Sequence, residues 1–332
     1  MNPLLSAFSR KYSGGFVTLQ STRTLPYGEA ALADAAAAIA AGQCVAVPTE
    51  TVYGLAADAT DSRAVAGIYA AKGRPSFNPL IVHVPDTDAA RRFALFDARA
   101  DRLAAAYWPG PLTLVLPLRP DSGIASLVTA GLDSIAIRVP AHRAMQGLLA
   151  ATGKPLAAPS ANASGTISPT RAAHVLATLD GRIPLILDDG ATRAGLESTI
   201  IALTGTQARL LRPGPIAAAT LAAALGEPVL AADDGAVVAP GMLASHYAPS
   251  KPLRLNATDA RPGEWLIGFG AVTGQDTLSA TGDLIEAGAR LFDSLHRADA
   301  SEAGGIAVAP VPMDGLGAAI NDRLTRAAAD RD

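Results

Sequence analysis

Cysteine is nearly absent from this chain of 332 residues, which contains only Cys44. A single cysteine excludes a disulfide framework within the chain and a zinc site built from several cysteines. The five histidines show neither an HExxH pattern nor a paired spacing, so a histidine metal site is not expected. No run of about 18 apolar residues is present, and we therefore expect no membrane-spanning helix.

Charge is also scarce. Charged residues make up 17% of the chain and the net charge is −3, which excludes a global basic field for nucleic acid but not a local basic cleft. A hydrophobic content of 49% excludes general disorder. Arg10 and Lys11 are not followed by an apolar core, so the first residues make a poor signal peptide. We predict a cytoplasmic protein.

Three common catalytic or phosphate-binding motifs are missing as well. The sequence has no GxxxxGKS/T loop, no GxGxxG after a predicted strand and no GxSxG elbow. If the protein binds a nucleotide, side chains and strand ends must hold it.

Short apolar runs alternate with alanine-rich stretches, a pattern that predicts a mixed α/β sheet in residues 27–226. Residues 1–26 read as an irregular or strand-forming extension. Predicted helices cover 29–41, 61–71 with Asp61 as cap and Gly73 as stop, 91–107 and 142–152, and another is predicted to begin at Ser168 as its cap. Predicted strands cover 44–47, 80–84, 112–118, 134–139, 155–158, 185–187, 198–203 and 207–211.

Residues 227–250 change character, because Gly, Ala, Pro and Asp dominate with little periodicity. We interpret this stretch as a linker, and because it is long and carries Tyr247 we predict that it forms a lid over a pocket of the first domain. A smaller α/β domain is predicted for 251–332. Its strands are predicted at 253–255, 265–269 and 306–309, and its helices at 282–298 and 316–329.

Lys72, Arg74 and Asn78 lie on a Gly/Pro turn that follows a predicted helix. Two cations and an amide suit a triphosphate, but late cations also complement a helix dipole, so both interpretations stay open. Arg138 lies among apolar neighbours in a strand and needs a partner if buried. That partner is either a ligand carboxylate or a carboxylate of the chain.

Small hydroxyl and amide residues follow the strand at 155–158, in the segment PSANASG and then at Ser168. Their backbone N–H groups can approach an anion, although a Ser/Asn turn with a helix cap explains them equally well. Taken alone, His83 reads as a core histidine, Arg212 as a turn residue and Tyr247 as a packing anchor.

Eight motifs occur here in the order typical of the YrdC-like threonylcarbamoyl-AMP synthase family, which the chain resembles from about Tyr27 onward. They are PTETVYGL, KGRPSFNPL, WPGPLTLVL, SIAIRVP, APSANASG, ESTI, LRPGPI and SHYAP. The segment after residue 253 resembles the C-terminal domain of the two-domain form, including its GLGAAINDRL stretch. The fold implied is a twisted mixed sheet around a large concave cavity, joined by a long linker to a Rossmann-like domain.

The resemblance also implies an activity. L-threonine, bicarbonate or CO₂, and ATP would give threonylcarbamoyl-AMP and pyrophosphate, for modification of tRNAs that read ANN codons. Mg²⁺ is expected to come with ATP, held mainly by phosphates and water rather than by a protein metal site. Partner proteins would use the intermediate, any direct contact with tRNA is expected to be weak, and no membrane is involved.

Site residues follow from the resemblance position by position. Threonine binding is implied for Thr51, His83, Arg138, the Ala158 backbone and Ser198. ATP binding is implied for Arg74, Asn78, Ser134, Ser160, Asn162, Ser168, Arg212 and Tyr247. Lys72 and Arg74 are the implied catalytic cations.

Composition bears on two other interpretations. A double-stranded-RNA or tRNA-binding module without activity is disfavoured by the net charge of −3. A carbamoyl-transfer domain of a hydrogenase-maturation protein is disfavoured because such proteins carry zinc-finger cysteines and this chain has only Cys44.

Overall fold

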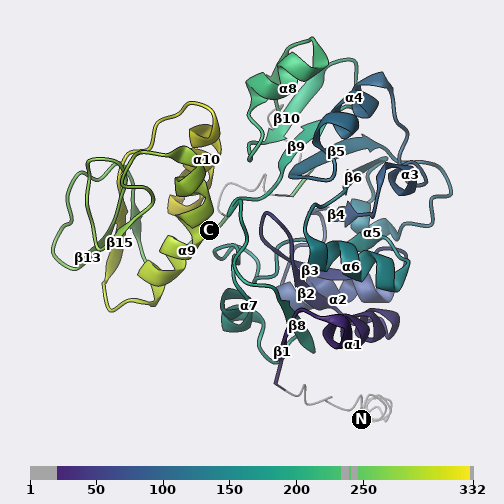
Figure 1. Cartoon of the computed structure of the whole chain (residues 1–332), viewed down its shortest axis with the longest axis horizontal. Helices are drawn as coiled ribbons and strands as arrows, with labels where there is room; N and C mark the ends of the chain where they lie inside the picture. The colour runs from purple at the N-terminus through teal and green to yellow at the C-terminus, as the bar shows by residue number, and fades with distance from the viewer. Residues whose placement is uncertain (1–20, 233–238, 241–245, 330–332) are drawn as a thin grey trace, which may run out of the picture.

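The computed structural model describes residues 21–232, 239–240 and 246–329. Within these residues the chain forms two α/β units, each with its own sheet (Figure 1). The larger sheet has eleven strands and mixes parallel with antiparallel neighbours, and the smaller sheet has four strands. The predicted mixed α/β fold with a second, smaller α/β domain is confirmed.

The elements of the larger unit follow. In spatial order its strands are β1 (Arg23–Pro26), β8 (Leu185–Asp188), β2 (Val45–Pro48), β3 (Tyr53–Asp58), β7 (Leu156–Ala157), β4 (Ile81–His83), β6 (Ser134–Arg138), β5 (Leu112–Pro117), β9 (Thr199–Ala202), β10 (Ala208–Arg212) and β11 (Val229–Ala231). Its helices are α1 (Glu29–Ala40), α2 (Ser62–Lys72), α3 (Thr87–Ala90), α4 (Ala98–Tyr107), α5 (Ser126–Thr129), α6 (Arg143–Thr152), α7 (Ala172–Leu179) and α8 (Ala218–Leu225).

The centre of this sheet places polar side chains at strand ends. Strands β4 and β6 are parallel, with His83 opposite Arg138 in register. Strand β7 runs antiparallel to β4, so the polar segment after Ala157 leaves the sheet near Ile81, where Ala158 N donates to Ile81 O at 2.9 Å. The backbone of these short strands is paired on both sides, which allows apolar residues to fill both faces of the sheet.

Helix α2 is an element that local sequence determines. Asp61 caps it through hydrogen bonds from Arg63 N (2.8 Å) and Ala64 N (3.3 Å), and Gly73 ends it with φ of 61°. The predicted helix is confirmed. Its two end signals directly flank it in the sequence, so no distant residue is needed to place its ends. The early stop leaves Lys72 in the last turn and Arg74 just beyond it.

The predicted helix over 91–107 is wrong in its first part. Asp97 accepts hydrogen bonds from Arg99 N and Ala100 N, so α4 begins at Ala98, and Ala94 instead bridges to Leu118. An internal Asp cap therefore interrupts an alanine-rich pattern that resembles a single helix.

Ser168 is not a helix cap, so that prediction is also wrong. Helix α7 begins at Ala172, and its cap position is Arg171. The Ser168 hydroxyl instead donates to Glu197, and Pro169 O accepts from Tyr53 N at 2.9 Å. Tertiary partners outcompete the local capping pattern here. The sequence interpretation also missed strand β3 and helix α8.

Part of the predicted linker belongs to the larger sheet, since Val229–Ala231 forms its edge strand β11 beside β10. Residues 233–238 and 241–245 of the predicted lid lie outside the described residues. Ala239 and the stretch His246–Ala248 are buried.

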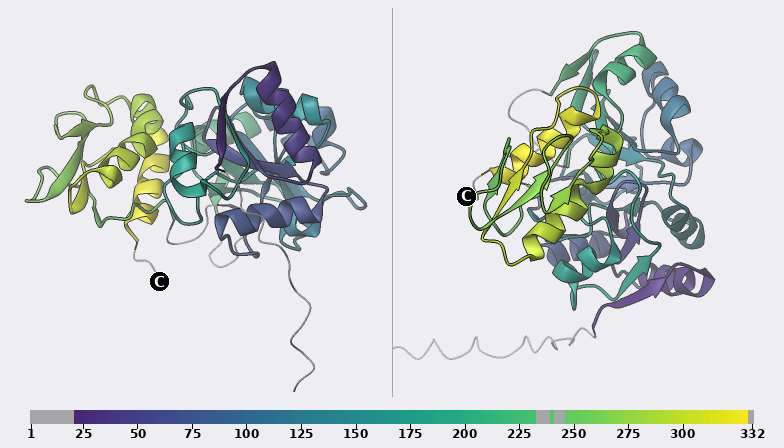
Figure 2. Two further views of the ribbon diagram at one scale, coloured as in Figure 1. Left: turned by 90° about the horizontal axis from the view of Figure 1, so that it is seen from below. Right: turned by 60° about the vertical axis from the view of Figure 1, so that its left-hand side comes forward.

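The second unit has an all-parallel sheet. Its strands, in spatial order, are β12 (Leu253–Arg254), β15 (Gly305–Val308), β13 (Glu264–Gly268) and β14 (Asp276–Thr277), and its helices are α9 (Leu284–Ala300) and α10 (Leu316–Ala328). Figures 1 and 2 place both helices between this sheet and the larger unit. Among the described residues, no helix combines the length and apolar character needed to cross a bilayer.

Gly317 fixes where α10 packs. A Cβ at this position would lie 1.9 Å from Pro312 O, so any side chain must push the helix away from the preceding turn. We expect Gly317→Ala to destabilise the second domain by about 1–3 kcal/mol, the usual cost of overpacking. Denaturant unfolding measures it. Gly304→Ala is the control, because a Cβ there meets only Gly263 O at 3.8 Å; equal losses for both variants would contradict the packing argument.

Candidate functional site

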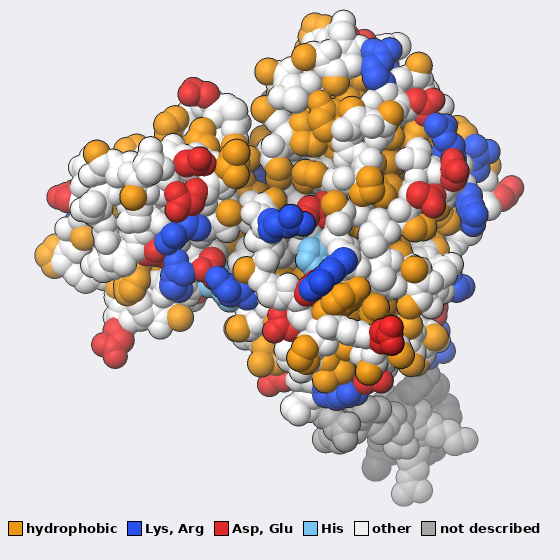
Figure 3. Space-filling model, viewed as in Figure 1, with side chains coloured by type: hydrophobic (Ala, Val, Ile, Leu, Met, Phe, Trp, Pro, Cys, Tyr) orange, Lys and Arg blue, Asp and Glu red, His pale blue; other side chains and the backbone are white. Residues whose placement is uncertain are grey.

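A pocket opens at the strand ends of the larger unit, with about 520 Å³ of empty space when the open solvent at its mouth is included. Several of its cations and a histidine come from strands β4, β6 and β10. Figure 3 shows exposed Lys and Arg side chains near the centre of one face, whereas the arginines of the pocket are buried. The pocket is lined by Thr49, Thr51, Val52, Gly54, Arg74, Ile81, His83, Arg138, Ala158, Pro159, Ser160, Glu197, Ser198, Arg212, Pro240, His246 and Tyr247.

Arg138, at the end of β6, is 3% exposed and already has a carboxylate partner in the chain. Its Nη2 lies 2.6 Å from Glu50 Oε1, its Nη1 donates to Thr51 Oγ1 at 3.0 Å, and its Nε donates to Gly110 O at 3.1 Å. Of the two interpretations left open by the sequence, the structure contains the internal ion pair. The three contacts fix the guanidinium rigidly at the pocket wall.

His83 extends from the neighbouring β4 into the same wall. Burial, together with the Arg138 charge, lowers the pKa of His83 to about 3, so the ring is neutral near pH 7. Its Nδ1 has no hydrogen-bond partner among the described residues. A neutral imidazole beside a fixed guanidinium can accept a hydrogen bond from, or donate one to, a small polar ligand.

Arg74 and Arg212 carry the least compensated charges at this site. Arg74 donates to the carbonyl oxygens of Asn78 and Pro79, and Arg212 donates to Ser198 O, Ser198 Oγ and Pro240 O. No ion pair joins either one to a carboxylate within the described part of the chain. Burial lowers the pKa of Arg74 to about 10 and also lowers that of Arg212. Two buried cations of this kind favour an anionic ligand.

Lys72 does not line the pocket, although it lies one residue from the turn that carries Arg74. Its Nζ donates to Ser160 O at 2.6 Å, to Asn162 O at 2.5 Å and to Asn162 Oδ1 at 3.3 Å. Burial lowers the pKa of Lys72 well below its usual value, and Arg74 adds to the effect. In this structure Lys72 therefore holds the 160–162 loop, which forms the pocket wall at Ser160.

The other predicted residues divide between the pocket and its surroundings. Thr51, Ala158, Ser160, Ser198 and Tyr247 line the pocket together with the arginines and His83. Four do not line it: Asn78, Ser134, Asn162 and Ser168. Asn78 Oδ1 is buried without a described partner, and Asn162 Nδ2 donates to the carbonyl oxygens of Ala163 and Thr166. Ser134 lies at the opposite end of β6 from Arg138.

Tyr247 closes one side of the pocket. It is 1% exposed and has a backbone φ of 64°, an unusual conformation for a residue with a side chain. Its hydroxyl has no hydrogen-bond partner among the described residues. A buried phenol without a partner costs free energy unless a ligand group or water binds it.

Three acidic or basic residues of the site were not among the predicted ones. Glu50 pairs with Arg138, and Glu197 pairs with Arg323 of helix α10, whose Nε lies 2.8 Å from Glu197 Oε2. Glu50 and Glu197 lie inside the motifs PTETVYGL and ESTI, and Arg323 lies inside GLGAAINDRL. The residue types were visible in the sequence. The members of each pair are 88 or more positions apart, however, so only the fold shows that they meet.

Glu50 makes the site sensitive to acid. Burial raises the pKa of this carboxyl, but the Arg138 charge and hydrogen bonds from Arg138 and Ala141 N outweigh burial and hold the pKa below 4.5. A lowered folded-state pKa contributes stability above the unfolded pKa, and that contribution is lost as pH falls through the folded value.

We therefore expect Glu50→Gln to lower the free energy of unfolding at pH 7, and the difference from wild type to shrink below pH 4.5. Urea unfolding at several pH values measures both effects. Asp34→Asn is the control, because it removes an exposed ion pair with Arg23 and should change stability little at any pH. A constant deficit for Glu50→Gln across the pH range would contradict the assignment.

Comparisons with known proteins place the chain in a family. The Sua5/YciO/YrdC family model, described as "Telomere recombination", matches residues 37–214. A second model, described as "Threonylcarbamoyl-AMP synthase, C-terminal domain", matches residues 216–329.

Full-length relatives agree with both matches. The threonylcarbamoyl-AMP synthase of Bacillus subtilis is 38% identical and covers 93% of this chain and 96% of its own length. That of Pyrococcus abyssi is 39% identical, over 90% of this chain and 94% of its own. A crystal structure of P. abyssi Sua5 complexed with L-threonine matches with a TM-score of 0.84 and 36% identity, over 92% of this chain and 96% of that one. The chain therefore belongs to the Sua5/YciO/YrdC family of enzymes, in the two-domain form that carries the threonylcarbamoyl-AMP synthase C-terminal domain.

Proposed function

We propose that this protein is an L-threonylcarbamoyladenylate synthase, which converts L-threonine, bicarbonate or CO₂, and ATP into threonylcarbamoyl-AMP and pyrophosphate. The observation that carries the proposal is the pair of buried guanidinium groups, Arg74 and Arg212, that line one pocket. Among the described residues neither forms an ion pair with a carboxylate, and Glu197 acts on Arg212 only at longer range. A triphosphate supplies the negative charge that would compensate them. The full-length relatives named threonylcarbamoyl-AMP synthase support the same substrate set.

The threonine half of the pocket would be the wall formed by Thr51, His83 and Arg138. The remaining N–H groups of Arg138 suit a substrate carboxylate, because Glu50 and Thr51 already fix the guanidinium plane. The related P. abyssi enzyme was crystallised with L-threonine, which supports an amino-acid ligand. Ser198 and the Ala158 backbone complete this half in the proposal.

The chemistry suits a site without a nucleophilic triad. The neutral threonine amine attacks CO₂ and releases a proton to water as the carbamate forms. A carbamate oxygen then bonds to the α-phosphorus of ATP as the bond to pyrophosphate breaks. Such a transfer depends on positioning and on stabilising charge on the leaving group rather than on a covalent enzyme intermediate. Arg74 and Arg212 would supply that charge, with ATP entering as its Mg²⁺ complex. Tyr247 would lie against the nucleotide as part of a lid.

The product would serve the threonylcarbamoyladenosine modification of tRNAs that read ANN codons, through partner proteins that take up the intermediate. Cytoplasmic localisation and weak direct contact with tRNA remain predictions.

Release of pyrophosphate tests the proposal directly. The full chain is mixed with MgATP, L-threonine and radiolabelled bicarbonate, and each component is left out in turn. We expect pyrophosphate and a labelled adenylate only when all three are present. Pyrophosphate release that is independent of threonine, or no release at all, would overturn the proposed function.

Arg138→Ala tests the threonine half. Losing a buried charge–carboxylate contact should weaken threonine binding by at least tenfold, whereas ATP binding should change far less. Isothermal calorimetry with each ligand separately gives both constants, and a thermal melt checks folding, because Glu50 loses its partner in this variant. Equal losses for the two ligands would rule out Arg138 as the threonine carboxylate site.

Arg74→Ala tests the triphosphate half. If Arg74 stabilises the leaving pyrophosphate, adenylate formation should fall by about 10² or more. If Lys72 acts on the phosphates, adenylate formation by Lys72→Ala should fall by a similar factor. Because Lys72 holds the 160–162 loop here, a loss of stability without a loss of turnover in the folded fraction would assign it a structural role only.

A further inference from the structure

Arg323 is a fully buried cation of the second domain that reaches the first. It lies on helix α10 and is 0% exposed. Its Nε donates to Glu197 Oε2 at 2.8 Å and its Nη2 donates to Pro213 O at 2.9 Å, both across the domain boundary. Its Nη1 donates to the adjacent Asp322 at 2.6 Å, which completes its charge balance within its own domain. Burial of such a group is tolerated only with these partners.

Glu197 transmits this contact to the pocket. Glu197 lines the pocket directly, and its other carboxylate oxygen accepts a hydrogen bond from Ser168 Oγ. Burial raises the pKa of Glu197, but the charges of Arg323 and Arg212 and the hydrogen bond from Ser168 outweigh burial and lower it. The carboxylate therefore stays charged and fixed at the boundary between the pocket and the second domain.

Tyr247 is held by the same domain. The Arg323 guanidinium lies over its ring at 5.1 Å from the centroid, and Phe292 of helix α9 packs against the ring at 5.5 Å. Tyr247 also lies within electrostatic range of Arg74 and Arg212 on the pocket side. Its left-handed backbone, with φ of 64°, needs surrounding contacts to persist. Both domains supply them, since His246 N donates to Arg326 O of the second domain and Ala248 N donates to Gly165 O of the first.

We propose that Arg323 is a positioning residue of the first-domain pocket, so that the second domain forms part of the nucleotide half of the site. This inference rests on the proposed function, since it assigns ATP to the side of the pocket where Arg74, Arg212 and Tyr247 lie. Arg323 fixes Glu197 and the Tyr247 ring in the orientation that this half requires. Among the described residues Arg323 forms no hydrogen bond, ion pair or ring contact with Thr51, His83 or Arg138, so we expect the threonine half to depend on it far less.

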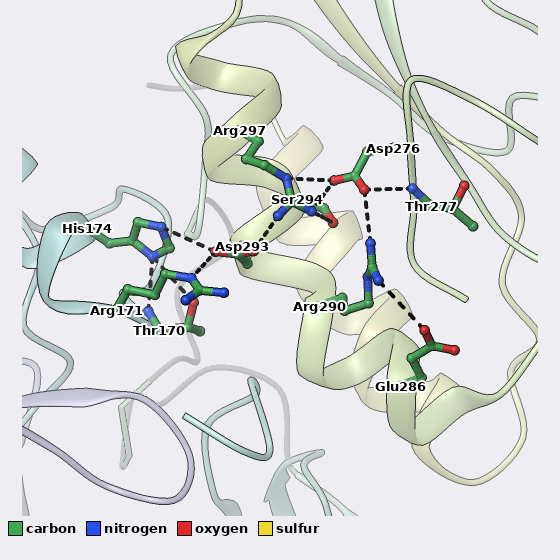
Figure 4. Close-up of polar contacts among 10 residues, drawn as sticks. All are labelled: Thr170, Arg171, His174, Asp276, Thr277, Glu286, Arg290, Asp293, Ser294 and Arg297. Carbon is green, nitrogen blue, oxygen red and sulfur yellow. Dashed lines mark hydrogen bonds and ion pairs between the residues drawn. The ribbon is translucent and has the colours of Figure 1, made fainter. Parts of the chain in front are cut away.

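A second interdomain cluster provides a matched control. Arg171, just before α7, donates to Asp293 of helix α9 at 2.7 Å, and the ring of His174 stacks on that of His296 at 3.8 Å (Figure 4 shows Arg171, His174 and Asp293). Arg171 and His174 also join the two domains, but they do not line the pocket. The side chain of Arg171 is 52% exposed, so its substitution should be tolerated.

The test compares Arg323→Gln and Arg323→Lys with Arg171→Gln in the full chain. Calorimetry measures the affinity for ATP and for threonine separately, pyrophosphate release gives KM and kcat, and a thermal melt measures folding. We expect Arg323→Gln to weaken ATP binding by about tenfold or more, the usual effect of losing hydrogen bonds to a buried charge. Threonine affinity should stay within about twofold, and Arg171→Gln should match wild type for both ligands.

Arg323→Lys keeps the charge beside Glu197 but cannot also reach Pro213 O and cover the Tyr247 ring, so its loss of ATP affinity should be intermediate. If Arg323→Gln does not fold, Arg323→Lys takes its place in the test, and its ATP affinity should fall while its threonine affinity stays within about twofold of wild type. The inference is overturned if a folded Arg323 variant binds ATP as wild type does, if ATP and threonine affinities fall by the same factor, or if Arg171→Gln loses ATP affinity equally. A wild-type protein that releases no pyrophosphate and binds no ATP would instead overturn the proposed function.

Discussion

The carboxylate of Glu197 is the group on which the arrangement of the two domains depends. It is 5% exposed, so it can remain charged only if cations and hydrogen-bond donors replace water around it. Arg323 comes from one domain and Ser168 from the other, and each occupies a different carboxylate oxygen. Closing the interface without Arg323 would bury the Glu197 carboxylate without its ion-pair partner, so the interface is specified by electrostatics as well as by apolar packing.

The same reasoning explains the character of the pocket. Arg138 and Arg323 have carboxylate partners, whereas Arg74 and Arg212 are bonded to neutral oxygens. Carbonyl dipoles stabilise a guanidinium only partly, because they carry no net charge. One side of the pocket therefore carries positive charge that no ion pair within the described residues balances. This imbalance is what favours an anionic ligand there over a purely structural role for the arginines.

The sequence was informative wherever one short segment contains the whole signal. Asp61 and Gly73 delimit α2 through local contacts, and His83 and Arg138 meet because they end the neighbouring parallel strands β4 and β6. Prediction failed where a distant partner decides. Ser168 resembles a helix cap but bonds Glu197, and the helix predicted over 91–107 is shortened to α4 by the cap at Asp97. The roles of Glu50 and Arg323 are invisible without the fold, because their partners are far away in sequence.

The separation of Glu197 from Arg323 also has a consequence for synthesis of the chain. The two residues are 126 positions apart. At the usual elongation rate of about 5–20 residues per second, roughly 6–25 s pass between the appearance of the carboxylate and that of its guanidinium partner. During this interval the first domain can fold, but Glu197 must stay hydrated, because among the described residues only Arg323 forms an ion pair with it. The nascent first domain should therefore keep this wall of its pocket open to solvent until helix α10 has emerged.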